Sequence, residues 1–263
     1  MVKKSSTINE QNLAVNVNEL YTCVQGEGKY AGVPHILIRM SGCPLRCFFD
    51  KSPCDTYYSS WFPEKGKFSL KDIEIFYKNH PNHHYTMISG GSPTANPQVL
   101  AKLIEIAKKY NHFVTIETEG SAFVQTEADF ISLSPKLSNS VPVTGKLVSF
   151  GPGRERVIIG SIDVERHEKG RKNYEAMIKL ISSHKDYQLK VVVSNFERDF
   201  PEIKALQKKL KVPNHKVYLM PEGTSEEQLK LNRQKLIEFC AEKGEYNYTD
   251  RLQVIVYGNK RGV

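Results

Sequence analysis

The chain has 263 residues, of which 40% are hydrophobic and 25% are charged, and its formal net charge at pH 7 is +8. This content can bury a sizeable core, so we expect one domain over residues 1–263 with a flexible start at 1–15. No apolar run is long enough to cross a bilayer, which predicts a soluble, cytoplasmic protein. No basic run is interleaved with aromatic residues, which argues against direct nucleic-acid binding and favours an anionic small substrate.

Strand-like and helix-like segments alternate along the chain, and such alternation predicts a parallel sheet with covering helices. Asn96 with Pro97, and Ser225 with Gln228, are typical of helix starts. The expected strands are residues 35–40, 85–89, 113–118, 129–134, 188–193, 216–220 and a terminal 252–257. The expected helices are residues 97–109, 171–182, 201–210 and 225–242.

Residues 138–170 interrupt this alternation. They are rich in glycine, including Gly151 and Gly153, and carry mixed charge with only short apolar runs. We therefore interpret 138–170 as an inserted excursion from the main fold.

Polar, cysteine and glycine residues follow or close the predicted strands. In a parallel α/β barrel the chemistry lies at the carboxyl ends of the strands. We therefore expect one shared mouth near five such residues: Cys43, Gly90, Thr118, Ser134 and Met220.

Three cysteines, Cys43, Cys47 and Cys54, lie close together after the first of these strands. Four thiolates close a [4Fe–4S] cluster, so three thiolates can hold one and leave an iron open to a small molecule. This is the arrangement of radical S-adenosylmethionine enzymes. The sequence therefore predicts a cluster with a reactive open iron.

Structural zinc and disulfides are the alternatives for these cysteines. Zinc would need a fourth nitrogen or sulfur ligand at similar spacing, and no histidine occurs between His35 and His80, which leaves Cys23 as the nearby candidate. Cys23 and Cys240 are otherwise interpreted as ordinary core or partly buried thiols. Five cysteines are too sparse for a secreted disulfide scaffold, so we expect reduced thiols.

The order of motifs along nearly the whole chain resembles the 7-carboxy-7-deazaguanine synthase family. The resemblance implies an α/β fold in the form of a partial, modified (β/α) barrel of the radical S-adenosylmethionine type, with residues 138–170 as the inserted segment. The motifs that carry it are Val24-Gln-Gly-Glu-Gly28, Gly32-Val-Pro34, Arg39, Ser41-Gly-Cys43, Cys54-Asp-Thr56, Ile88-Ser-Gly-Gly-Ser-Pro93, Ile116-Glu-Thr-Glu-Gly120, Leu133-Ser-Pro-Lys136, Leu189-Lys-Val-Val-Val193 and Tyr257-Gly-Asn-Lys-Arg-Gly-Val263.

The chain departs from this pattern in two places. The family often has a glutamate after the two glycines, whereas this chain has Ser92, which can donate a hydrogen bond but carries no charge. Six residues, 48–53, separate the second and third cysteines, four more than the two that are common in radical S-adenosylmethionine proteins. Asp50, Lys51, Ser52 and Pro53 suit a turn that is extruded while Cys54 returns to the cluster.

The resemblance also implies the site residues. Cys43, Cys47 and Cys54 would ligate the cluster, and the hydroxyl of Thr56 would bind Mg²⁺, a hard-oxygen site, unless this threonine only caps a turn. The implied substrate residues are Val24, Gln25, Gly26, Glu27, Arg39, Ser89 and Val263. The implied S-adenosylmethionine residues are Pro53, Asp55, Gly90, Gly91, Ser92, Glu117, Thr118, Ser134, Pro135, Lys136, Met220, Pro221 and Glu222.

Three of these roles have specific alternatives. Arg39 would clamp a substrate carboxylate with two hydrogen bonds, or else form an ion pair on its strand. The free carboxylate of Val263 would contact the substrate with Lys260 and Arg261 positioning the tail, or else the end is a solvated basic tail. Paired glycines such as Gly90–Gly91 commonly mark turns, and the other strand-end residues can serve packing alone.

The implied reaction converts 6-carboxy-5,6,7,8-tetrahydropterin to 7-carboxy-7-deazaguanine with loss of ammonia, in queuosine-type 7-deazapurine biosynthesis. A 5′-deoxyadenosyl radical would abstract hydrogen from C6, and S-adenosylmethionine would be regenerated. The implied partners are an electron donor such as flavodoxin or ferredoxin and a second copy in a homodimer. Two alternatives remain open, a glycyl-radical activase and a catalytically silent cluster-binding protein.

Overall fold

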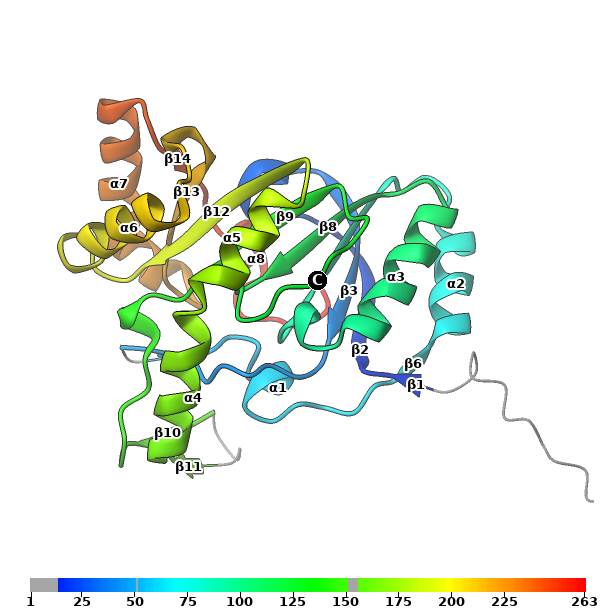
Figure 1. The fold of residues 1–263 in the computed structure, drawn as a ribbon, viewed down its shortest axis with the longest axis horizontal. Coiled ribbons are helices and arrows are strands. Elements are labelled where there is room, and N and C mark those ends of the chain that lie inside the picture. The colour runs from blue at the N-terminus through cyan, green and yellow to red at the C-terminus, as the bar shows by residue number, and fades with distance from the viewer. Residues whose placement is uncertain (1–13, 51, 151–155) are drawn as a thin grey trace, which may run out of the picture.

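The computed structural model describes residues 14–50, 52–150 and 156–263. Its centre is an eight-stranded sheet with the strand order β14-β13-β12-β9-β8-β7-β3-β2 (Figure 1). Every neighbouring pair is parallel except β2 with β3. The strands are β2 (Val17–Val24), β3 (Pro34–Met40), β7 (Tyr85–Gly90), β8 (Phe113–Thr118), β9 (Phe130–Leu133), β12 (Asp186–Val193), β13 (Val217–Pro221) and β14 (Asn247–Tyr248).

Six of the seven predicted strands are confirmed, as β3, β7, β8, β9, β12 and β13. The seventh prediction is wrong, because residues 252–257 form a helix, α8 (Leu252–Tyr257), that ends before Gly258 at φ 63°. A short apolar run such as this one fits a strand or a helix equally by composition. In this place the Leu252 N–H donates to the Gly26 carbonyl at 3.2 Å, which ties the start of the helix to the segment after β2.

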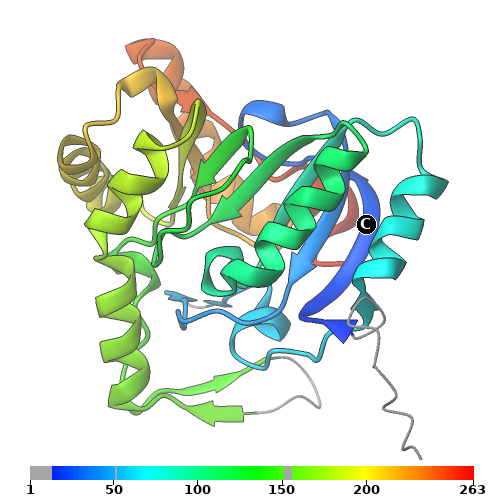
Figure 2. The same cartoon turned by 45° about the vertical axis from the view of Figure 1, so that its right-hand side comes forward.

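Helices α3 and α5 lie in front of the sheet, and the short helix α8 lies behind it (Figures 1 and 2). The α-helices are α1 (Tyr57–Ser60), α2 (Leu70–Asn79), α3 (Pro97–Lys109), α4 (Ser161–Arg171), α5 (Tyr174–Ser182), α6 (Phe196–Leu210), α7 (Glu226–Lys243) and α8. Short 3₁₀ turns are η2 (Gly28–Tyr30), η3 (Pro93–Ala95), η4 (Ser138–Ser140) and η5 (Asn214–Lys216).

The predicted helices are confirmed with shifted boundaries. The helices predicted at 97–109 and 225–242 match α3 and α7. The helix predicted at 201–210 starts earlier, because the Asn195 side chain accepts from the Arg198 N–H and caps α6, which leaves Pro201 inside the helix. The helix predicted at 171–182 begins instead at Tyr174, after the Asn173 cap.

Alternate residues of the central strands face opposite sides of the sheet. On β12, Leu189 and Val191 are fully buried in the main hydrophobic core under the helices. Lys190 and Val192 point the other way and line a cavity. The same alternation on β3 sends Ile38 into the core and Arg39 into the cavity, so the parallel sheet itself separates the core from the functional face.

The lengthened cysteine loop forms a small hairpin, with β4 (Phe48–Phe49) paired to β5 (Ser52–Pro53) and Asp50 at φ 36°. The Cys54 N–H then donates to the Cys47 carbonyl at 3.1 Å, so the chain returns beside the second cysteine as the sequence predicted. Lys51 lies outside the described residues. Asp50 is held by Arg198 of α6, with 3.0 Å between Nη1 and Oδ1.

The segment 138–170 packs against this loop, and its described residues, 138–150 and 156–170, add no strand to the central sheet. It contains a hairpin of β10 (Leu147–Ser149) and β11 (Arg156–Ile158), and most of α4. Phe150 contacts Trp61, Phe62 and Tyr57, with ring centroids 4.9–5.6 Å apart. Gly151 and Gly153 lie outside the described residues. The excursion therefore supports the cysteine loop through a second, smaller hydrophobic cluster.

The start of the chain is described from residue 14 onward. Ala14–Val15 form β1, which pairs with β6 (Phe68–Ser69), so the end of the predicted flexible start is ordered. Residues 1–13 lie outside the described residues. In the described ranges, no helix is long and apolar enough to cross a membrane.

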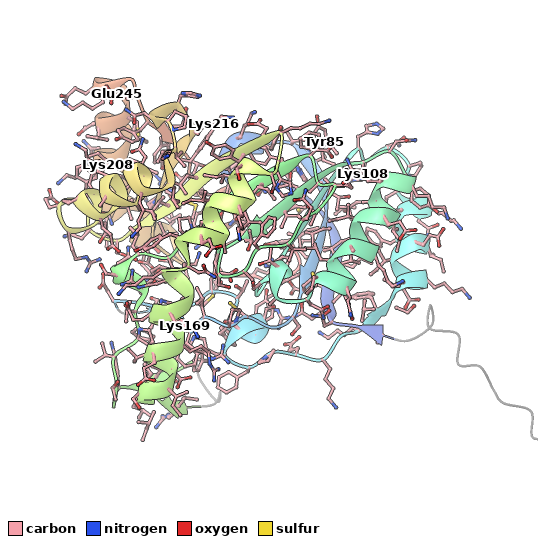
Figure 3. The ribbon with its side chains drawn as sticks, in the orientation of Figure 1. Tyr85, Lys108, Lys169, Lys208, Lys216 and Glu245 are labelled. Carbon is pink, nitrogen blue, oxygen red and sulfur yellow. The ribbon has the colours of Figure 1, made fainter. Side chains whose placement is uncertain are left out.

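Several lysines on the helices lie at or near the surface. Lys108, Lys169 and Lys208 point away from the body of the protein in Figure 3. Lys108 forms an ion pair with Asp129, while Lys169 and Lys208 are exposed. Much of the positive charge is therefore solvated helix surface and not a concentrated binding patch.

Candidate functional site

One cavity lies at the carboxyl ends of the parallel strands and is closed on its other side by the segment after β2, the cysteine loop and α8. The structure brings 22 of the 24 predicted site residues to its lining. These are Val24, Gln25, Gly26, Glu27, Arg39, Cys43, Cys47, Pro53, Cys54, Asp55, Thr56, Ser89, Gly90, Gly91, Glu117, Thr118, Ser134, Lys136, Met220, Pro221, Glu222 and Val263.

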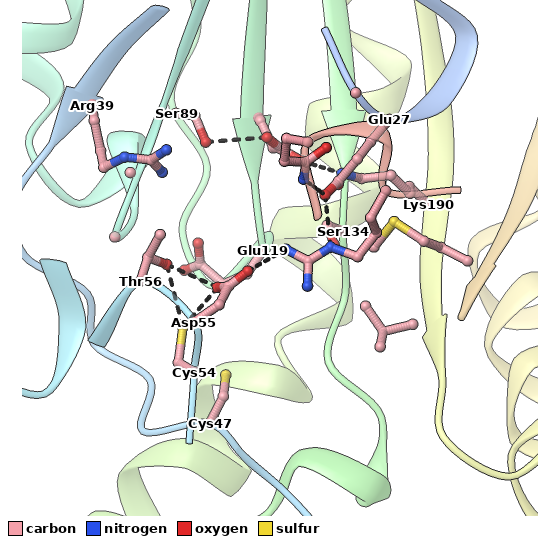
Figure 4. A pocket seen from close by; sticks show the side chains of 18 of the residues that line it. Glu27, Arg39, Cys47, Cys54, Asp55, Thr56, Ser89, Glu119, Ser134 and Lys190 are labelled. Carbon is pink, nitrogen blue, oxygen red and sulfur yellow. Dashed lines mark hydrogen bonds and ion pairs between the residues drawn. The ribbon is translucent and has the colours of Figure 1, made fainter. Parts of the chain in front are cut away.

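The three predicted cluster ligands line this cavity, and Cys47 and Cys54 lie together at one end of it (Figure 4). Burial raises the pKa of the Cys43 thiol, and the charges of Glu119 and Cys47 raise it further. Burial and the neighbouring Cys54 likewise raise the pKa of Cys47. Without a ligand these thiols therefore favour their protonated form, and bound iron would supply positive charge that stabilises the thiolates.

The donor set fits a cluster better than a single metal ion. Within residues 14–50, 52–150 and 156–263, no three His, Cys, Asp or Glu side chains are assembled around one metal position. Each thiolate of a four-iron cluster binds a different iron, so its ligands do not converge on one point. Cys43, Cys47 and Cys54 are all free thiols that line the same cavity. Such an arrangement suits ligands that each bind a different iron.

The two glycines after β7 sit where no side chain fits. A Cβ on Gly90, which has φ 136°, would lie 2.0 Å from the Met40 carbonyl oxygen. A Cβ on Gly91 would lie 2.3 Å from the carbonyl oxygens of Gly42 and Ser59. These glycines let the strand end pack against the cysteine loop and leave backbone facing the cavity.

Ser92 and Pro135 are the two predicted residues that do not line the cavity. Ser92 is 2% exposed, and its hydroxyl donates to Glu119 at 2.9 Å. Lys136, next to Pro135, does reach the cavity and donates to the Ser134 carbonyl at 2.8 Å.

The opposite end of the cavity holds a network of ion pairs (Figure 4). Lys190, with 3% of its side chain exposed, contacts both Glu27 and Glu117. Arg251 contacts Glu27 at 3.0 Å and also pairs with Asp55, beside the third cysteine. This network joins the segment after β2, β8, β12, the cysteine loop and the start of α8.

The network fixes the charges of its members. Burial opposes ionisation of Glu27, but Lys190 and Arg251 outweigh it and hold its pKa well below the usual value. For Lys190, burial is outweighed by Glu117 and Glu27, which raise its pKa. These groups therefore stay charged across the physiological pH range.

Arg39 is already ion paired in this structure. Its Nε lies 2.5 Å from Glu19 Oε2, and its Nη2 donates to the Tyr21 hydroxyl at 3.5 Å. It lines the cavity at the same time. The strand ion pair and a contact with a bound carboxylate can therefore coexist, since a guanidinium has five N–H donors.

Hydrogen-bonding contacts within the protein hold two further predicted site residues, Gln25 and Thr56. The Gln25 Nε2 lies 2.7 Å from the Met87 sulfur, and Gln25 Oε1 accepts from the Glu27 N–H at 3.2 Å. Thr56 Oγ1 lies 3.3 Å from both the Cys54 sulfur and Asp55 Oδ1. The hydroxyl of Thr56 is thus oriented toward the thiol end.

Sequence reasoning missed several cavity residues. The sequence did offer a signal for Lys190, because it is the one charged residue in the mostly apolar strand predicted at 188–193. Arg251 and Gln253 had none, since Arg251 lay outside every predicted element and Gln253 fell in the wrongly predicted strand at 252–257. Cys23, interpreted as an ordinary thiol, lines the cavity, and burial raises its pKa to about 11. Glu119 was passed over beside Glu117 and Thr118.

Comparison with known proteins identifies relatives over almost the full length of the chain. It is 34% identical over 247 residues to the 7-carboxy-7-deazaguanine synthase of Rhodopirellula baltica, which covers 94% of this chain and 88% of the relative. It is 32% identical over 252 residues to the protein of the same name from Halobacterium salinarum, covering 94% and 91%. No protein-family model matches the chain.

The fold is similar to a crystal structure of QueE from Escherichia coli. The TM-score is 0.56 at 22% sequence identity, and the match covers 90% of this chain and 93% of that chain. This likeness establishes a shared α/β architecture with a large, mostly parallel central sheet.

Proposed function

The chain belongs to the 7-carboxy-7-deazaguanine synthase family, and we propose that it converts 6-carboxy-5,6,7,8-tetrahydropterin to 7-carboxy-7-deazaguanine with loss of ammonia. This makes it a carbon–nitrogen lyase of 7-deazapurine biosynthesis. The observation that carries the proposal is the meeting of three cysteine thiols and a buried charge network in one cavity.

Cys43, Cys47 and Cys54 would hold a [4Fe–4S] cluster, and the strand ends around Gly90, Gly91 and Ser134 would hold S-adenosylmethionine. When bound, these groups supply radical chemistry that removes a hydrogen atom from C6 of the pterin. The sheet would then act as the partial barrel of the radical S-adenosylmethionine type, in one domain with 138–170 as its insertion. The protein's part is to bind, orient and exclude water.

The charged end suits a pterin because it combines fixed charges with hydrogen-bonding groups. Glu27 and the backbone around Gln25 offer acceptors and donors to the ring edge, and Arg39 has N–H groups for a carboxylate. Glu27 is kept ionised by Lys190 and Arg251, so it accepts hydrogen bonds from ring N–H groups throughout the physiological range. Binding at this end would orient C6 toward the thiol end.

Thr56 would contribute a hard hydroxyl oxygen to Mg²⁺, with substrate oxygens and water completing the coordination. Its position beside Cys54 and Asp55 supports this assignment. The homodimer and the flavodoxin- or ferredoxin-type electron donor remain predictions from the family resemblance.

The proposed function is tested by reconstituting the protein anaerobically with iron and sulfide. It is then incubated with dithionite, S-adenosylmethionine, Mg²⁺ and the pterin, and the products are followed by mass spectrometry. We expect 7-carboxy-7-deazaguanine, and none when the pterin or S-adenosylmethionine is omitted. Cluster formation and S-adenosylmethionine cleavage without this product would contradict the substrate assignment; failure to form a cluster would favour a silent binding protein.

A further inference from the structure

Glu119 is a buried carboxylate at the thiol end of the cavity. It follows directly after β8, is 5% exposed, and lines the cavity together with Cys43 and Cys47. The sequence motifs assigned it no role. A carboxylate in this position needs explanation, because burying a charged group is costly unless it is paired and hydrogen-bonded.

The partners of Glu119 are hydroxyl groups only. Ser92 donates to its Oε1 at 2.9 Å, Ser121 donates to the same oxygen, and Thr118 lies 3.4 Å from Oε2. No lysine, arginine or histidine of residues 14–50, 52–150 or 156–263 forms an ion pair with it. An ionised carboxylate has about four acceptor positions, so Oε2 retains capacity toward the cavity.

The contact with Ser92 links this carboxylate to the altered glycine motif. Ser92 stands where the family resemblance often has glutamate, but it does not line the cavity. Its N–H is fixed by the Gly42 carbonyl at 2.8 Å, and its hydroxyl turns to Glu119. The chain therefore still brings one carboxylate to this position, but from the end of β8 and not from the end of β7.

We propose that Glu119 is a cofactor-binding residue that accepts a hydrogen bond from the α-amino group of S-adenosylmethionine, in place of the glutamate missing at position 92. This inference rests on the proposed function for the identity of the cofactor. An amino group that is protonated or metal-bound presents N–H donors and no acceptor, which suits the free capacity of a carboxylate. Ser92 becomes a positioning residue that orients Glu119.

The test is equilibrium binding of S-adenosylmethionine to the anaerobically reconstituted protein, without pterin or reductant. Glu119→Gln keeps the size and one acceptor but removes the charge, and we expect affinity to fall by roughly tenfold or more, as for loss of a hydrogen bond to a charged group. Glu127→Gln is the matched control, because Glu127 is exposed on the connection between β8 and β9, and it should bind as the wild type does. Iron and sulfide content are compared in all samples.

A cofactor analogue without the α-amino group separates recognition from a structural role. It should bind wild type and Glu119→Gln equally, because the contact that differs is absent. Glu119→Asp, which retains the charge at shorter reach, should recover part of the affinity for S-adenosylmethionine.

Equal affinity of wild type and Glu119→Gln for S-adenosylmethionine would overturn the inference. An equal loss of affinity for the cofactor and its analogue would also overturn it, by showing general disruption. Neither result depends on deazaguanine formation, so failure of the substrate assignment and failure of this contact are distinguishable.

Discussion

The two ends of the cavity differ in how their buried carboxylates are paired. At one end Glu27 and Glu117 are paired with Lys190, and Arg251 joins Glu27 to Asp55 beside Cys54. At the other end, the three thiols lie near Glu119, which has hydroxyl partners and no ion pair within the described ranges. The acids of the first end are paired within the protein, whereas we propose that the second end is completed by what binds there.

From this difference we infer different binding roles for the two ends. A prearranged ion-pair network holds its donors and acceptors in place before substrate arrives, which lowers the ordering cost of binding. Burial raises the pKa of the Cys43 and Cys47 thiols, so they keep their protons until a bound metal displaces them. We therefore propose that the charged end recognises the substrate and that the thiol end holds the cofactors.

The largest effect is expected for Cys54→Ala, which removes one ligand of the thiol end. We expect loss of the cluster's visible absorption, iron content well below that of the wild type, and no detectable deazaguanine. Cys240→Ala is the matched control, since Cys240 is a buried thiol on α7, away from the cavity. Full turnover by Cys54→Ala would remove the distinction between the two ends.

The next largest effect is expected for Lys190→Met, which breaks the charged end. Removing one partner of a buried ion pair leaves uncompensated charge, so the free energy of unfolding should fall by about 3–5 kcal/mol. Denaturant unfolding measures this change. Lys208→Met, at an exposed position on α6, should be nearly neutral, and adding Glu117→Gln to Lys190→Met should restore part of the loss. Equal stability of the two single variants would show that the network is not prearranged.

A smaller effect is expected for Gly91→Ala, where the residue after β7 packs against Gly42 and Ser59. The new methyl group would overlap two backbone oxygens at 2.3 Å, so the strand end or cysteine loop must shift, at about 1–3 kcal/mol. Thermal unfolding and cluster content report the shift. Gly160→Ala, where the nearest atom would be 3.7 Å away, serves as the control; a Gly91→Ala protein no less stable than this control would argue against close packing here.

The smallest effect concerns Glu64, an ion-paired carboxylate near the surface and outside the cavity. Its hydrogen bond from Arg261 lowers its pKa to about 2. Because the folded pKa is depressed, the pair stabilises the protein above pH 4.5 and the contribution is lost as the pH falls toward about 2. Glu64→Gln should cost about 0.2–1 kcal/mol at pH 7, and the difference from wild type should shrink over that window in urea unfolding. A difference independent of pH would contradict the ion-pair explanation.

The central sheet was predictable because local patterns determine it. Apolar segments with β-branched residues identified β3, β7, β8, β9, β12 and β13, and the residues that follow them identified the cavity mouth. The strand β2 was missed because it is polar at Asn18 and Glu19, which are nevertheless buried. Their partners, Ser59, Arg39 and Tyr58, come from other parts of the chain, so no local pattern reveals them.

The charged end was less predictable than the thiol end for the same reason. The cysteines are close in sequence, and their spacing carries chemical meaning on its own. The pair of Arg251 and Asp55 joins positions 196 residues apart, and it depends on residues 252–257 forming a helix and not the predicted strand. Tertiary contacts decided this element, because its apolar run fits either structure.

The most direct test of the division into two ends measures S-adenosylmethionine binding and pterin binding separately on two reconstituted variants. Glu27→Gln should retain cofactor affinity and lose pterin affinity by roughly tenfold or more. Cys54→Ala should lose cofactor affinity, because the cluster that completes the thiol end is absent, while retaining pterin affinity. The opposite pattern, or loss of both ligands in both variants, would contradict the account.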